Sequence, residues 1–162
     1  MRRSDIMKKD KIDEEFLKDL TARLPYRVRG QVQIEVSTGE YSIESGHLEF
    51  DDVDVDVELL SINVGNEDID VEPLDDKYSD VLVDYNYTVN DFIPYLRPLS
   101  SMTDEEEKEY NILSSSACSP IDSQKFIDWL NEHHFDYREL IEKRYAIAAP
   151  EEIYEKKIEN EQ

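Results

Sequence analysis

Between Phe50 and Leu59 the chain alternates apolar and acidic residues, reading Phe-Asp-Asp-Val-Asp-Val-Asp-Val-Glu-Leu. A period of two predicts a half-buried β-strand, because successive side chains of a strand leave the backbone on opposite faces. The aliphatic members are expected to face a core: Val53, Val55, Val57 and Leu59. The acidic members are expected to face solvent as a row of carboxylates about 6.6 Å apart: Asp52, Asp54, Asp56 and Glu58.

The negative charge of the chain is concentrated around this stretch. The 162 residues include 40 Asp and Glu against 18 Lys and Arg, which gives a formal net charge of -22. Residues 35–91 contain 18 of these acidic residues and one basic residue, Lys77. Such a field repels nucleic acids and anionic membranes and attracts basic proteins or cations. We therefore expect no direct binding to nucleic acid or membrane.

The cellular compartment is indicated by the single cysteine, Cys118. One cysteine cannot form an internal disulfide, which fits a reducing cytoplasm. No apolar run approaches 18 residues, and the start Met-Arg-Arg-Ser-Asp lacks the apolar region of a signal peptide. We expect a soluble protein in the cytoplasm of a bacterial host cell.

The pattern of the chain predicts one α+β domain over residues 12–150, with a flexible N-terminus at 1–11 and a charged tail at 151–162. Apolar residues at helical spacing predict a helix over 12–24, which Pro25 ends. Alternating segments predict a sheet over 27–89, with a hairpin turn at Thr38-Gly39 and a bulge where the inward phase changes after Leu59. Its last strand is expected over 81–89.

Helices are predicted over residues 91–149. Thr103 with Glu106 forms a capping box, and Ser119 before Pro120 gives a second helix start. Asp136 with Glu139 predicts a further short helix. The order of helix, strands and helices indicates a small antiparallel, barrel-like sheet, SH3-like or OB-like, preceded by one helix and followed by two to four.

Three segments carry a resemblance to a known family: residues 21–28 (TARLPYRV), then residues 95–103 (YLRPLSSMT), then residues 129–138 (WLNEHHFDYR). They resemble a protein family of no known function that recurs in gut anaerobes and in their phages and mobile elements. The resemblance implies a phage or mobile-element context and no catalytic residue. The strongly acidic middle of this chain is a departure from it.

The acidic row has two interpretations. Phosphates follow a DNA duplex as a regular line of negative charges, and carboxylates on alternate strand positions form a line of comparable pitch, so the sheet could imitate DNA. An acidic sheet can also serve only to keep a small domain soluble. In the first interpretation the partner-binding residues are Asp52, Asp54, Asp56, Glu58, Asp68, Asp70 and Glu72.

No cofactor and no metal site is expected. Three of the four glycines fall at predicted turns, which leaves too few for a glycine-rich phosphate-binding loop. Weak Ca²⁺ binding by Asp52, Asp54 and Asp56 is an alternative, although the EF-hand pattern fails where it requires glycine and finds Val57.

We interpret the chain as a non-enzymatic accessory protein that acts by protein–protein interaction on a basic surface of a host protein, such as a nucleic-acid-binding enzyme. An anti-CRISPR or anti-restriction inhibitor that imitates DNA would act in this way. One alternative is an enzyme of unrecognised class that uses Cys118 or His133 and His134. Another is a phage structural or assembly component.

Overall fold

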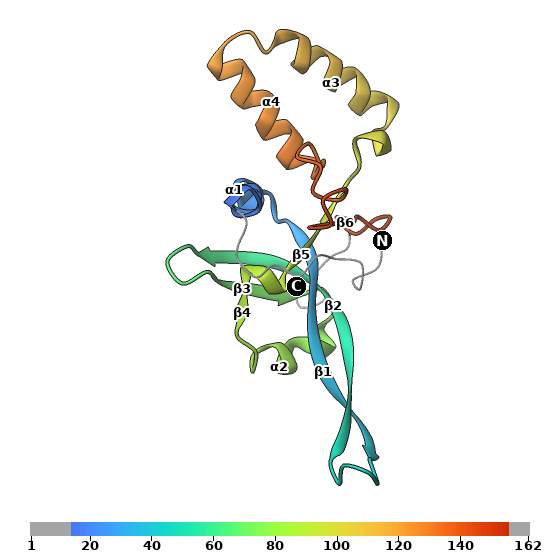
Figure 1. The fold of residues 1–162 in the computed structure, drawn as a ribbon. Coiled ribbons are helices and arrows are strands. Elements are labelled where there is room, and N and C mark those ends of the chain that lie inside the picture. Colours follow the sequence, from blue (N-terminus) through green and yellow to red (C-terminus); the bar gives the residue numbers. More distant parts are fainter. Residues whose placement is uncertain (1–13, 156–162) are drawn as a thin grey trace.

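The computed structural model describes residues 14–155, which contain four α-helices and six β-strands. The helices are α1 (Glu14–Arg23), α2 (Ser79–Leu82), α3 (Asp104–Ser116) and α4 (Pro120–Glu132). The strands are β1 (Arg29–Tyr41), β2 (Leu48–Asn63), β3 (Asp68–Pro73), β4 (Tyr87–Thr88), β5 (Ile93–Leu96) and β6 (Ile147–Ala148). They form one curled sheet in the order β4-β3-β2-β1-β5-β6 (Figure 1). The expected α+β class is confirmed.

Helix α1 ends where the sequence predicts. Arg23 is its last residue, and a single 3-10 turn, η2 (Leu24–Tyr26), follows with Pro25 in it. Proline tolerates the first turn of a helix but cannot continue an α-helix, because it has no backbone N–H. The expected flexible segment 1–11 and the first residues of the expected helix lie outside the described residues.

The first hairpin is longer than predicted, and the turn expected at Thr38-Gly39 is wrong. Strand β1 continues to Tyr41, and its pairing with β2 shifts register between Ser37 and Tyr41. Gly39 has a φ of +77°, so it provides the backbone conformation of this irregularity within the strand. The chain reverses over residues 42–47, where the N–H of Ser42 donates to the carbonyl of His47.

The predicted change of phase in β2 is confirmed. The pairing of β2 with β3 shifts register between Leu59 and Ser61. Leu59 is buried and Leu60 is half exposed, so one extra residue is accommodated at this point. The inward-facing residues change from odd to even numbers there, as a bulge requires.

The strand predicted over 81–89 is wrong. The carboxylate of Asp75 accepts a hydrogen bond from the N–H of Lys77 and starts a 3-10 turn, η3 (Asp76–Tyr78), which leads directly into α2. Only β4 is extended in this region. A local side-chain cap therefore overrides the alternating pattern of Val81 and the residues that follow it.

Strands β5 and β6 fall in the region predicted to be helical. All four residues of β5 are buried, so its sequence shows no alternation. Strand β5 pairs with β1 at Gly30 and Gln31, and β6 pairs with β5 in parallel. The sheet is therefore mixed and not purely antiparallel.

The predicted caps of α3 and α4 are confirmed. Thr103 and Glu106 form the capping box of α3, and the Ser119 side chain accepts from the N–H of Asp122 at the start of α4. The short helix predicted after Asp136 is absent from the structure. The Asp136 carboxylate instead accepts from the N–H groups of Leu140 and Ile141 and holds a series of turns.

The beginning of the predicted tail is packed against the body. Ile153 is 1% exposed, and Arg29 donates to its carbonyl over 2.7 Å. The prediction of a loose charged tail is wrong for residues 151–155, and residues 156–162 lie outside the described part of the chain.

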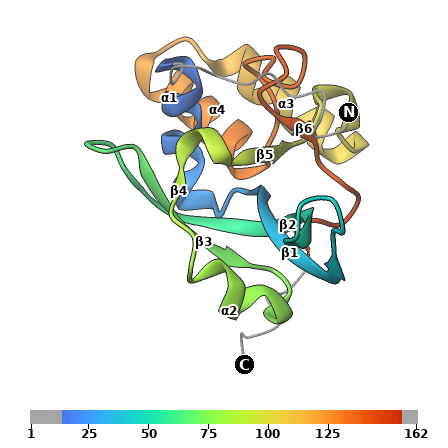
Figure 2. The ribbon, with the colours of Figure 1, turned by 60° about the horizontal axis from the view of Figure 1, so that its bottom comes forward.

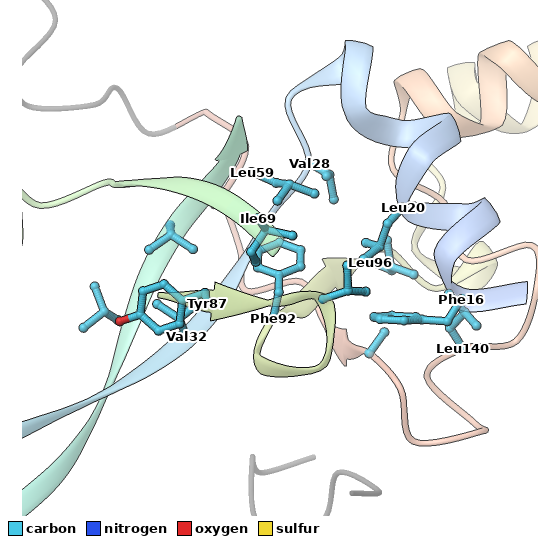
Figure 3. Packing of buried hydrophobic residues seen from close by; sticks show 14 of the residues in the cluster. Phe16, Leu20, Val28, Val32, Leu59, Ile69, Tyr87, Phe92, Leu96 and Leu140 are labelled. Carbon is cyan, nitrogen blue, oxygen red and sulfur yellow. The ribbon is translucent and has the colours of Figure 1, made fainter. Parts of the chain in front are cut away.

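The main core fills the inner face of the curled sheet, where α1 and the turns after α4 cover it. Figure 3 shows ten of its side chains by name: Phe16, Leu20, Val28, Val32, Leu59, Ile69, Tyr87, Phe92, Leu96 and Leu140. A smaller cluster lies elsewhere and consists of Leu74, Ile93, Tyr95, Ile147 and Ile153. This second cluster covers the middle of the outer face, since Ile93 lies directly opposite Gln31 of β1.

Candidate protein-binding surface

The hairpin of β1 and β2 extends beyond the core as a two-stranded arm, defined here as residues 35–54 (Figure 1). Figure 2 turns the molecule so that this arm comes toward the viewer. None of residues 35–52 is buried. The arm can therefore contact another molecule without any change in the core.

The arm carries seven acidic residues and no Lys or Arg. It also carries large apolar side chains that are exposed to solvent: Val36, Tyr41, Ile43, Leu48 and Phe50. Ile43 at the tip is fully exposed. Exposed apolar groups gathered on one projection indicate an interaction site more strongly than scattered ones do.

Register places the predicted carboxylates on the outer face of the sheet. Asp52 lies directly opposite Glu35, and Asp54 lies opposite Gln33. Both aspartates are exposed. Like charges directly across a strand pair repel each other, so Glu35 and Asp52 weaken the arm slightly and strengthen its negative field.

Asp56 and Glu58, the members of the acidic row nearest the core, form hydrogen bonds with other residues of the fold. The Tyr95 hydroxyl donates to the Asp56 carboxylate over 2.5 Å, and burial together with this hydrogen bond raises the pKa of Tyr95. Glu58 is 3% exposed and accepts from Arg27 over 2.8 Å and from Arg29 over 3.2 Å. Glu58 faces outward as predicted, but it lies beneath other groups and is not available to a partner.

A second exposed acidic group lies on β3. Asp68 and Asp70 are exposed, while Glu72 is half-buried and directly opposite Glu58. Ser61 donates to Asp70 and Asn66 donates to Asp68, each over 2.6 Å. The predicted row is therefore divided into an exposed part on the arm and an exposed part on β3, with a covered middle.

The residues of the enzyme alternative are not brought together. Cys118 precedes α4, and His133 and His134 follow it. The 13 residues of α4 span about 20 Å at the usual helical rise. A thiol at one end of this helix cannot be activated by an imidazole at the other.

Both histidines are used in packing. The His133 ring stacks near Trp129, and its Nδ1–H donates to the Trp129 carbonyl over 2.9 Å. The His134 ring lies 3.5 Å from the ring of Tyr154. Burial, followed by the nearby charge of Arg23, lowers the pKa of His134 to about 3.

Within residues 14–155, no three His, Cys, Asp or Glu side chains are arranged to hold a metal ion. Asp52, Asp54 and Asp56 therefore do not form the cage that the Ca²⁺ alternative requires. In the same part of the chain, every helix is too short or too polar to cross a membrane.

The three segments that carry the family resemblance meet around Phe135. The Arg97 N–H donates to the His134 carbonyl, and the Asp136 N–H donates to the Arg97 carbonyl, each over 2.8 Å. Arg23, whose side chain is fully buried against Asp19, donates to the Phe135 carbonyl over 2.7 Å. These segments form a structural junction that is separate from the acidic arm.

No family model, curated protein or solved structure matches this chain. Function is therefore inferred from the chemistry of the arm. The sequence pattern indicated the exposed Asp52 and Asp54. The pattern did not indicate that Tyr41, Ile43 and Phe50 are exposed. Their position among acidic residues is the sequence feature from which this exposure could have been predicted.

Proposed function

We propose that this chain is a non-enzymatic binding protein whose acidic arm recognises a basic surface of a nucleic-acid-binding protein. The single observation that supports this most strongly is the arm itself. It projects from the core, exposes acidic and apolar side chains together, and contains no Lys or Arg. Such a projection fits a positively charged channel or groove better than it fits a small molecule.

Imitation of DNA is the form of recognition that we propose. On the arm, Asp52 and Asp54 follow one strand, and Glu35 lies across from Asp52 on the other. Carboxylates on two neighbouring strands thus present a group of negative charges to a surface that normally binds phosphates. The exposed Phe50 next to them would add apolar contact that DNA does not offer.

The proposed setting is the cytoplasm of a bacterial host, as a phage or mobile-element accessory protein. The family resemblance supports this setting, and an inhibitor of CRISPR or restriction nucleases is the proposed role. The identification of the sheet as an SH3-like or OB-like barrel stays a prediction.

The test is a competition experiment. The full chain, immobilised, is used to capture basic proteins from a host lysate at low and moderate salt, and each captured protein is then tested for binding to duplex DNA. We expect the wild-type chain to displace DNA and to lose affinity as salt increases, because screening weakens a charge-driven complex.

Asp52→Lys combined with Asp54→Lys should abolish this displacement. Both positions are exposed, and the change removes the repulsion between Glu35 and Asp52, so the variant is expected to fold. The matched control is Glu132→Lys with Glu142→Lys, which changes the net charge equally at exposed positions outside the arm. Equal loss of displacement in both variants would mean that only net charge matters and would contradict the proposal.

A further inference from the structure

Along the outer part of the arm, over residues 48–53, strand β2 has a backbone edge that no other described strand covers. Strand β3 pairs with β2 from Val57 onward, and the N–H of Leu74 extends this ladder by one bond to the carbonyl of Asp56. Among residues 14–155, no strand other than β1 pairs with β2 over residues 48–55. In Figure 1 the arm stands clear of the other described elements.

The pairing pattern shows which backbone groups this edge presents. The N–H of Glu35 donates to the hydroxyl of Tyr85 over 3.0 Å, so the backbone of Glu35 faces away from β2. In an antiparallel pair, the backbone N–H and carbonyl groups of two directly opposite residues either point toward each other or both point away from the pair. Asp52 is opposite Glu35, so its N–H and carbonyl face away from β1, toward the side on which β3 lies further along the strand. By the same period of two, the backbone groups of Phe50 face the same way.

The other edge of the arm is closed at the equivalent position. The Tyr85 hydroxyl contacts both the N–H and the carbonyl of Glu35, and β5 pairs with β1 at Gln31. The two edges of the arm therefore differ. The edge of β2 presents backbone N–H and carbonyl groups to which another strand can form hydrogen bonds.

Charge decides what kind of strand can bind there. A second copy of this chain that paired through the same edge would place Asp52 and its acidic neighbours beside one another, which is unfavourable. A partner strand with Lys or Arg at alternate positions would place its cations beside Asp52 and Asp54 on the outer face. An apolar residue two positions further would lie beside the exposed Phe50.

We propose that the edge of β2 over residues 48–53 binds an extended basic segment of the partner protein by strand addition. This inference rests on the proposed function, because it names the kind of partner segment that the acidic arm receives. Backbone hydrogen bonds provide affinity, and alternate Lys or Arg side chains provide specificity through the outer-face carboxylates.

The probe for this proposal is the capped peptide acetyl-Lys-Val-Lys-Thr-Leu-Thr-amide, titrated into the full wild-type chain. Paired antiparallel to β2, its two Lys and its Leu share the face of Asp54, Asp52 and Phe50. We expect peptide binding to shift the amide resonances of Phe50 and Asp52 and to slow their hydrogen exchange.

Two methylated forms of the peptide provide the control. N-methylation of the second Lys and the Leu blocks amides that face the edge, and should weaken binding about ten-fold or more. N-methylation of the Val and the first Thr blocks amides that face away, keeps the charge, and should leave affinity unchanged within about two-fold.

Two results would overturn strand addition. If both methylated peptides bind as well as the parent peptide, the contact uses side chains alone, and the proposed function survives without this mode. If sedimentation shows a dimer of the chain that the peptide dissociates, the edge serves a second copy instead. The Asp52→Lys, Asp54→Lys variant tests the role of the outer-face carboxylates. If the peptide binds this variant as tightly as it binds the wild type, the charge-driven function itself is contradicted.

Discussion

At the scale of single residues, His134 makes folding sensitive to pH. Its ring is 8% exposed, stacks on Tyr154, and has no hydrogen-bond partner for Nδ1 in the described part of the chain. Its pKa falls from 6.5 to about 3 in the folded state, first because of burial and then because of Arg23 and Arg97. The unfolded chain therefore binds a proton at a higher pH than the folded chain does.

We predict that the contribution of His134 to stability is complete above about pH 6.5 and is lost as the pH falls toward 3. The loss should approach about 1.4 kcal/mol per pH unit within this window. Urea unfolding at several pH values measures it. His134→Asn removes the titration and suits the positive φ of 61° at this position.

The exposed His47 on the arm provides the control, since His47→Asn should leave the pH dependence unchanged. If wild type and His134→Asn lose stability equally between pH 7.5 and 5, the buried neutral histidine does not account for the pH dependence.

The exposure of individual acidic residues could be predicted from the sequence only in part. Alternation correctly gave the side of the strand on which Asp52, Asp54 and Glu58 lie. It could not show that Glu58 is buried against Arg29, which also donates to the Ile153 carbonyl, because these groups are far apart in the sequence and meet only in the folded chain.

At the scale of elements, the pairing of β1 with β5 depends on Gly30. A Cβ atom at this position would lie 2.2 Å from the carbonyl oxygen of Ile93 and 2.7 Å from the ring of Phe92. The close contact with backbone cannot be relieved by a side-chain movement. Gly30 therefore permits the close approach of the two strands that joins the sheet to its β5–β6 edge.

We predict that Gly30→Ala destabilises the fold by about 1 to 3 kcal/mol, the usual range for overpacking a core. Thermal unfolding followed by circular dichroism measures the effect. Gly65→Ala is the matched control, because its Cβ would meet only the end of the Asn63 side chain at 3.4 Å. Equal melting temperatures for Gly30→Ala and the wild type would show that β5 is not held in this close contact.

Elements defined by local signals could be predicted from the sequence, and elements defined by distant partners could not. The caps at Thr103 and Ser119 act within one turn, so the starts of α3 and α4 follow from the residues alone. Strand β5 is covered on both faces and pairs with β6, some fifty residues later. Pro94 argues against a helix within these four residues, but a short apolar run without alternation does not by itself predict a strand.

At the scale of the whole molecule, the arm and the body have separate roles. The body holds the buried side chains, including Arg23, which pairs with Asp19 within α1 and donates to the Phe135 carbonyl after α4. Residues 35–52 of the arm contribute no buried side chain. Stability and recognition should therefore be separable by shortening the hairpin.

We predict that replacing residues 35–52 by Asn-Gly leaves the melting temperature within a few degrees of the wild type. Ile34 and Val53 lie directly opposite each other, so a two-residue turn can join them. Far-ultraviolet circular dichroism and thermal unfolding establish that the shortened chain folds.

The affinity of this shortened chain for a captured basic partner, measured as a function of salt beside the wild type, tests the role of the arm most directly. We expect the wild type to bind with an affinity that falls steeply as salt increases, and we expect no binding by the folded, shortened chain. Equal affinity and equal salt dependence for the two chains would contradict the proposed role of the arm.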